Sequence, residues 1–226
     1  MMMNGEDFLQ PLRQIDGLQV AFVPRMPLVD SDCTRDEVMI RLRDDHARVV
    51  ASLGFEESQW WRAQQVHGHS VAVAGKAGQI IAPDGLPVIE NVDGMIAAAD
   101  SGLVLAIYVA DCGAIWLADM DNGAYGLLHS GKKGTEGNIL GVAVEMMNTC
   151  FGSHPENIVG VLGPCIRPPH YELNFAAEIS KQATTAGLAH FFDSQLCTAS
   201  DLSKYYSYRK EMGRTGRMMA LIGRHN

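Results

Sequence analysis

Two histidines and one cysteine stand out because each lies in a short motif near the end of an apolar run. The motifs are Gln65-Val66-His67-Gly68, Ala110-Asp111-Cys112 and His129-Ser130-Gly131. Two imidazoles and a thiol suit Zn²⁺ with one coordination position left open. Their spacing lacks the short repeat of a zinc finger, so a buried cysteine and two surface histidines remain an alternative. If the three side chains converge, the sequence predicts a metalloenzyme.

Local chain geometry leaves two questions open at this site. Asp111 and Cys112 are neighbours that would point to opposite faces of a regular strand, so both can line one pocket only if the chain turns. Gly113 follows directly and favours such a distortion. His69 would share a face with His67 on an extended strand, which makes it an alternative ligand or a residue that supports one.

Glycines and lysines around His129 predict an anion site. The segment from Gly126 to Lys133 nearly matches a P-loop, but it lacks the Ser or Thr that holds Mg²⁺. A glycine-rich turn that leads into a helix still presents free backbone N–H groups to an oxyanion. Lys132 and Lys133 would add positive charge beside it.

A second group of cations lies near the C-terminus. The stretch from Lys204 to Arg224 holds six Lys or Arg against one Glu. Arg209, Arg214 and Arg217 can each offer a planar fork to phosphate. Arg209 follows a cluster of tyrosines, which favours a role in binding over an ordinary surface position.

The composition is that of an ordinary globular protein. The longest apolar run, Leu103 to Ala110, is far shorter than a membrane-spanning helix. A net charge of -8 argues against nucleic-acid or membrane-surface partners. Five scattered cysteines and no visible signal peptide indicate a reducing compartment, so we expect a cytoplasmic protein. The length of 226 residues fits a single domain over residues 1–226.

The hydrophobic pattern predicts an α+β fold, a single compact domain with a mixed β-sheet and flanking helices. A first helix should begin at the capping box Thr34–Glu37 and end at Gly54. A second should begin at Thr135 and end at Gly152, and a third should run over residues 176–186. A Gly- and Pro-rich loop is expected over 75–87. Short strands are expected over 18–23, 60–66, 70–74, 95–99, 103–110, 114–118, 124–129, 158–162 and 218–222.

Taken in order, the motifs resemble those of the laccase-domain family. Its members are described as multicopper polyphenol oxidases and as zinc-containing purine nucleoside phosphorylases. Besides the three motifs above, the resemblance rests on Asp93-Gly94, Gly163-Pro164-Cys165-Ile166, Tyr171-Glu172, Cys197-Thr198, Ser207-Tyr208-Arg209-Lys210 and Thr215-Gly216-Arg217-Met218.

The resemblance implies an α+β fold and a metal ion, Zn²⁺ or alternatively Cu²⁺, bound by His67, Cys112 and His129. It also implies phosphorolysis of adenosine, inosine, guanosine and methylthioadenosine, with adenosine deamination as a companion activity. The expected partners are therefore a purine nucleoside and phosphate. The residues expected to bind the substrate or phosphate are Gln65, Lys133, Arg209 and Arg217.

Two segments depart from the family pattern. Lys132 and Lys133 stand where members of the family have Trp and Arg, which removes a stacking ring and a bidentate phosphate ligand. The chain between Tyr171 and Asn174 is shorter than is usual in the family, so we expect part of the pocket wall to be absent.

Other activities remain open. A four-copper laccase needs several His-x-His pairs, whereas this chain has eight histidines and one such pair, His67-Gly68-His69. Copper-dependent polyphenol oxidation is therefore the alternative function. A further alternative makes Cys112 a nucleophile and His129 its base, as in cysteine hydrolases, and the family fold is similar to that of the cytotoxic necrotizing factor deamidases. A structural metal would instead have four protein ligands.

Overall fold

The computed structural model describes residues 7–26 and 29–225. The helices are α1 (Gln10–Arg13), α2 (Arg35–Ser52), α3 (Lys132–Glu136), α4 (Ile139–Phe151) and α5 (Phe175–Thr185), with short 3₁₀ turns at Glu57–Gln59, Pro155–Asn157 and Thr198–Ser200. The strands are β1 (Leu18–Val23), β2 (Trp60–Arg62), β3 (Val71–Val73), β4 (Gln79–Ile81), β5 (Pro87–Ile89), β6 (Gly94–Ala97), β7 (Val104–Val109), β8 (Gly113–Asp119), β9 (Tyr125–Ser130), β10 (Ile158–Leu162), β11 (His190–Asp193) and β12 (Met218–Arg224).

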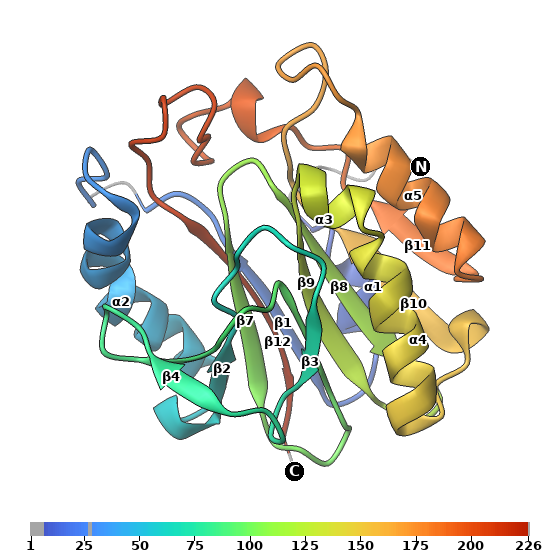
Figure 1. Cartoon of the computed structure of the whole chain (residues 1–226). Coiled ribbons are helices and arrows are strands. Elements are labelled where there is room, and N and C mark those ends of the chain that lie inside the picture. The colour runs from blue at the N-terminus through green and yellow to red at the C-terminus, as the bar shows by residue number, and fades with distance from the viewer. Residues whose placement is uncertain (1–6, 27–28, 226) are drawn as a thin grey trace.

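Two sheets pack face to face, and helices cover their outer faces (Figure 1). One sheet has four strands in the order β1-β12-β7-β2, and the other has six in the order β11-β10-β8-β9-β6-β3. Most neighbours are antiparallel, but β2 with β7, β3 with β6 and β10 with β11 are parallel. The predicted α+β fold with mixed strand directions is confirmed; its strands form these two packed sheets and a separate two-stranded sheet of β4 and β5.

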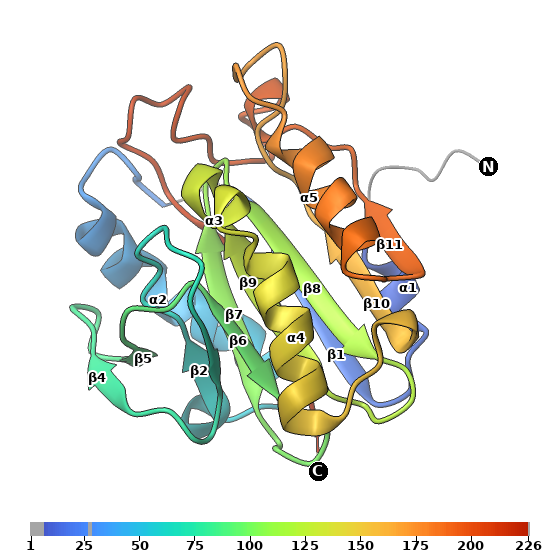
Figure 2. The ribbon, with the colours of Figure 1, turned by 45° about the vertical axis from the view of Figure 1, so that its right-hand side comes forward.

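The core lies in three layers because the central strands are buried on both faces. Ile107 and Ile222 of the smaller sheet meet Trp116 and Leu127 of the larger one between the sheets. On the far side of the smaller sheet, β7 and β12 pack against α2. On the far side of the larger sheet, β8 and β9 pack against α4 and α5 (Figure 2). A strand that is covered on both faces has a continuous apolar sequence, as β7 has.

Helix boundaries follow local capping chemistry. The capping box predicted for α2 is confirmed, since Thr34 accepts from the Glu37 N–H and the Glu37 side chain accepts from the Thr34 N–H. The prediction that Thr135 caps α4 is wrong. Its hydroxyl donates to the carbonyl of Gly131 instead, and Asn138 is the cap because its side chain accepts from the Gly141 N–H.

Several strand predictions are also corrected. The strand expected over 60–66 ends at Arg62, because the chain after it adopts left-handed backbone conformations at Gln65 and His67. The loop expected over 75–87 contains β4, which pairs with β5 in a small hairpin, and β11 was not predicted. Within residues 7–26 and 29–225, no helix combines the length and the apolarity that crossing a membrane requires.

Candidate metal centre

The structure brings the three expected ligands together from different elements. His67 lies between β2 and β3, Cys112 lies in the turn between β7 and β8, and His129 lies near the end of β9. Their ligand atoms are all within 4.8 Å of one another, close to the separations of about 3.3–3.8 Å that tetrahedral Zn²⁺ with bonds of about 2.0–2.3 Å imposes on its ligands. Among the described residues, His69 does not belong to this group.

One carboxylate orients both histidines. Asp93 is fully buried, and it accepts backbone hydrogen bonds from His67 at 2.9 Å and from Gly68 at 2.6 Å. Its Oδ1 also lies 2.8 Å from Nδ1 of His129. When Nδ1–H donates to this carboxylate, Nε2 of His129 is left to bind a metal, as is usual for metal-binding histidines. The donor set and its support therefore fit a zinc or copper ion.

The loop that carries His67 has an unusual backbone. Gln65 and His67 have φ of 62° and 61°, in the left-handed region that residues other than glycine rarely adopt. The bonds from Asp93, together with a 2.9 Å bond from the Gln65 N–H to the Val92 carbonyl, hold this conformation. Backbone strain of this kind concentrates at functional sites.

The turn at Cys112 places two neighbouring side chains on one cavity. Asp111 has φ of 81°, so the alternation of a regular strand is broken and both Asp111 and Cys112 line the cavity. Gly131 allows the thiol to sit there, because a Cβ at this position would lie 2.8 Å from Sγ of Cys112.

The charges of the cluster favour the thiolate form of Cys112. Burial would raise the pKa of this thiol, but His129 and His67 lower it to about 6. Burial would lower the pKa of His129, but Cys112 and Asp93 raise it to about 9. Near neutral pH the cysteine is therefore a thiolate, the form that binds metals and that attacks as a nucleophile.

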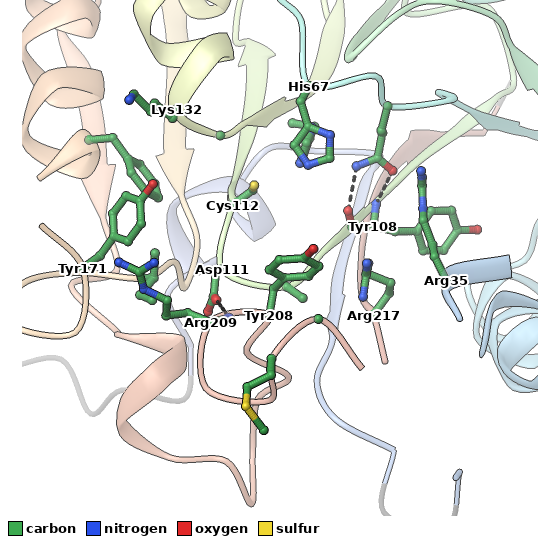
Figure 3. A pocket seen from close by; sticks show the side chains of 18 residues that line it. Arg35, His67, Tyr108, Asp111, Cys112, Lys132, Tyr171, Tyr208, Arg209 and Arg217 are labelled. Carbon is green, nitrogen blue, oxygen red and sulfur yellow. Dashed lines mark hydrogen bonds between the residues drawn. The ribbon is translucent and has the colours of Figure 1, made fainter. Parts of the chain in front are cut away.

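The cluster opens into a cavity of about 790 Å³ (Figure 3). Small-molecule sites typically measure about 300–1,000 Å³, so there is room for a substrate larger than a single sugar or base. Tyr171 and Phe175 line one side. The short segment after Tyr171 therefore still contributes aromatic side chains to the wall.

Two of the residues expected to bind substrate lie in positions that limit this role. Gln65 lines the cavity, but its amide is held by the backbone of Tyr108, with Nε2 donating at 2.6 Å and Oε1 accepting at 2.8 Å. Lys133 is exposed on α3 and is not among the described residues that line the cavity, whereas Lys132 is. Helix α3 has only five residues, so the segment that resembles a P-loop does not lead into a long helix.

The two arginines expected to bind phosphate both line the cavity. Arg209 forms an ion pair with Glu172 and lies over the ring of Tyr171, 5.1 Å from its centroid. Arg217 is partly buried and donates to the carbonyls of the two residues before it. Arg214 instead pairs with Asp32 at the surface.

Asp111 anchors the C-terminal loops at the cavity. Its Oδ1 accepts from the hydroxyl of Thr198 at 2.6 Å, and its Oδ2 accepts from the hydroxyl of Ser207 at 3.0 Å and from the Arg209 N–H at 2.7 Å. These bonds hold Arg209 in position before substrate binds. The sequence did not predict that Asp111 and Asp93 bind other parts of the site. Their positions could have indicated it, because Asp93 precedes Gly94 and Asp111 precedes Cys112 within motifs.

Comparisons with known proteins find relatives over most of this chain. A family model described as multi-copper polyphenol oxidoreductase laccase matches residues 33–186 and 172–225. A purine nucleoside phosphorylase of Deinococcus radiodurans is 32% identical over 206 residues, which cover 80% of this chain and 76% of the relative. The purine nucleoside phosphorylase YlmD of Geobacillus stearothermophilus is 28% identical over 214 residues, or 80% of this chain and 78% of the relative. The crystal structure of YlmD from that organism has a TM-score of 0.75 and 22% identity, covering 94% of this chain and 93% of that one. This likeness supports the fold.

Proposed function

The chain belongs to the family described as multi-copper polyphenol oxidoreductase laccase, and from that membership we propose that it is a metal-dependent purine nucleoside phosphorylase. Two relatives with 32% and 28% identity carry that name. The observation that carries the proposal is the convergence of His67, Cys112 and His129 on a cavity that also contains cationic side chains. A metal ligand set and a place for phosphate thus lie in one cavity.

The proposed substrates are adenosine, inosine, guanosine and methylthioadenosine, with inorganic phosphate as the second substrate and adenosine deamination as a companion activity. The proposal places the enzyme in the cytoplasm, because the cysteines of the described chain are all free and a reducing compartment keeps thiols in that state.

In this proposal His67, Cys112 and His129 would hold the metal, zinc or alternatively copper, which would supply a Lewis acid to the cavity. Asp93 keeps the proton of His129 on Nδ1 and so fixes the orientation of the ring. Cys112 contributes the thiolate that its lowered pKa favours.

Phosphorolysis requires an oxygen of hydrogenphosphate to bond to C1′ of the ribose while the bond from C1′ to the purine nitrogen breaks. The departing purine takes the proton that hydrogenphosphate loses.

Arg209 and Lys132 orient the phosphate, with Lys132 taking the role expected of Lys133. The Arg209–Glu172 pair is exposed, at 53% and 62%, so it contributes little energy and opens readily to phosphate. Gln65 acts by fixing Tyr108, and Arg217 faces the nucleoside.

A cysteine hydrolase is the second candidate, because Cys112 with a pKa of about 6 beside His129 with a pKa of about 9 also suits a nucleophile and its base. Polyphenol oxidation has less support. The described residues contain one group that could hold a metal, so oxidation would have to proceed on a single copper ion.

Substitution of the three ligands separates these functions. We expect His67→Ala, Cys112→Ala and His129→Ala each to lose both bound metal, measured by mass spectrometry, and phosphate-dependent release of hypoxanthine from inosine. His69→Ala is the matched control and should keep both. Activity that survives His67→Ala but not Cys112→Ala would contradict the metal mechanism and favour the cysteine hydrolase.

A further inference from the structure

The cavity contains two cationic groups on opposite sides of Cys112 (Figure 3). Lys132 and Arg209 lie on one side, and Arg35 and Arg217 lie on the other, beside Tyr108. Phosphorolysis of a nucleoside, which is uncharged, needs only one anion site. The second group is therefore unexplained by the proposed reaction.

The first group adjoins the metal ligands along the chain. Lys132 follows Gly131, where an added Cβ would lie 2.8 Å from Sγ of Cys112, and the Arg209 N–H is bonded to Asp111, the neighbour of Cys112. This group is placed to hold the phosphate that reacts next to the metal.

The second group carries charge that no carboxylate neutralises. Nη1 of Arg217 donates to the carbonyls of Thr215 and Gly216 at 3.0 and 2.9 Å, and Nη2 of Arg35 donates to the carbonyl of Gln64 at 3.1 Å. Within residues 7–26 and 29–225, neither arginine forms an ion pair. Both guanidinium groups thus bond to backbone carbonyls, and no carboxylate pairs with either of them within the described residues.

The anionic groups of the cavity lie at the candidate metal site and form no ion pair with these two arginines among the described residues. Asp111, the only carboxylate among the described residues that line the cavity, accepts three hydrogen bonds from the C-terminal loops, and the Cys112 thiolate is a proposed metal ligand. Burial, and then the like charge of Arg35, lower the pKa of Arg217, whereas Cys112 and Asp111 act in the opposite direction. Two guanidinium groups that face one cavity attract an anion, and phosphate oxygens match their geometry.

We propose that Arg35 and Arg217 bind a phosphoryl group carried by the substrate itself, so that the substrates of this chain include purine nucleoside 5′-monophosphates. The inference rests on the proposed function and refines its substrate class. In the reaction, hydrogenphosphate bonds to C1′, the bond from C1′ to the purine nitrogen breaks, and the purine takes the proton. The products are the free purine and ribose 1,5-bisphosphate, which keeps the 5′-phosphoryl group between the two arginines.

Steady-state kinetics with adenosine 5′-monophosphate and adenosine test the assignment. We expect the wild-type kcat/KM to be higher for the nucleotide. Arg35→Gln should lower the nucleotide value about 10- to 100-fold, the effect of losing a charged hydrogen bond, and should lower the adenosine value far less. Arg48→Gln is the matched control on the same helix, because Arg48 is 73% exposed and pairs with Asp45; it should change neither value.

Two kinetic outcomes would overturn the inference. One is an Arg35→Gln variant that treats the nucleotide and adenosine alike. The other is a higher KM for inorganic phosphate in the Arg35→Gln variant with adenosine as substrate. That result would assign the two arginines to the phosphate co-substrate.

Calorimetric binding in phosphate-free buffer separates this inference from the proposed function. The wild type should bind adenosine 5′-monophosphate at least about tenfold more tightly than adenosine, and Arg35→Gln should remove the difference. Nucleotide binding that depends on Arg35 without any release of base would overturn the phosphorylase and keep the phosphoryl site. Phosphorolysis of adenosine without Arg35-dependent nucleotide binding would overturn the phosphoryl site and keep the phosphorylase.

Discussion

At the scale of single residues, the site depends on hydrogen bonds that fix the ligands before a metal binds. Asp93 accepts from two backbone N–H groups of the His67 loop and from the ring of His129. Burial would raise the pKa of this carboxyl, but the bonds from His129, Gly68 and His67 hold it below its ordinary value. Asp93 therefore fixes both the backbone conformation at His67 and the tautomer of His129.

Asp93→Asn should weaken metal binding without removing any ligand. The amide nitrogen of asparagine cannot accept the hydrogen bond that one carboxylate oxygen accepts now, so a donor is left without a partner. We expect zinc affinity to fall about 10- to 100-fold, as measured by competition with a chelator. Asp100→Asn, at an exposed position, is the control, and equal affinities for the two variants would show that Asp93 does not position the ligands.

Residue types made the three candidate ligands predictable, because imidazole and thiolate groups are among the usual ligands of zinc. The roles of Asp93 and Asp111 were not predictable, since their partners come from segments that only the pairing of strands brings together. Among the described residues, Lys132 lines the cavity and Lys133, the lysine expected to bind phosphate, does not. Both lysines are exposed, and they differ in direction because neighbouring residues on a helix point about 100° apart.

At the scale of elements, α2 covers the four-stranded sheet and buries a histidine in doing so. His46 is 1% exposed, and its ring lies 5.4 Å from that of Tyr108. Neither ring nitrogen has a hydrogen-bond partner among the described residues. Burial, and then the charge of Arg62, lower the pKa of His46 from 6.5 to about 4, so the ring is neutral in the folded protein.

This histidine should make the protein sensitive to mild acid. As the pH falls below 6.5, the unfolded chain binds a proton at His46 and the folded chain does not until about pH 4, so stability is lost as the pH falls through this window. Between pH 7.5 and 5 we expect a loss of about 2 kcal/mol in the free energy of unfolding from this group. Urea unfolding of His46→Leu should lack that part of the loss. An unchanged pH dependence in the variant would show that His46 titrates normally.

Element boundaries were predictable where one local signal dominates. The capping box at Thr34 and the left-handed glycine at Gly152, with φ of 73°, gave the start of α2 and the end of α4. Two competing polar residues precede α4, Thr135 and Asn138, and Thr135 is taken up by α3, where its hydroxyl donates to the carbonyl of Gly131 four residues earlier. The hairpin of β4 and β5 was missed because its pairing depends on contacts across a loop rich in Gly and Pro.

At the scale of the whole molecule, the two sheets share one core. Trp116 of the six-stranded sheet is fully buried between the sheets, and its indole N–H donates to the carbonyl of Leu221 in the four-stranded sheet at 2.8 Å. Residues of both sheets belong to the same apolar cluster. Neither sheet can keep its inner face buried without the other, so we propose that the described residues belong to one domain, as expected for residues 1–226.

We therefore expect the protein to unfold in one cooperative transition. Far-ultraviolet circular dichroism, which follows the backbone, and tryptophan fluorescence, which follows Trp116 between the sheets together with Trp60 and Trp61 in β2, should give coincident urea curves. Two separated transitions would indicate that the sheets fold as independent units.

The central claim is that His67, Cys112 and His129 support phosphorolysis of purine nucleosides. The most direct test is to measure adenine and hypoxanthine released from adenosine and inosine by the purified protein, with and without inorganic phosphate, alongside its metal content. The account predicts release that requires phosphate, yields ribose 1-phosphate in equal amount, and accompanies about one zinc ion per chain, the number a single three-ligand site can hold. Phenol oxidation with bound copper, or hydrolytic activity that needs neither phosphate nor metal, would contradict it.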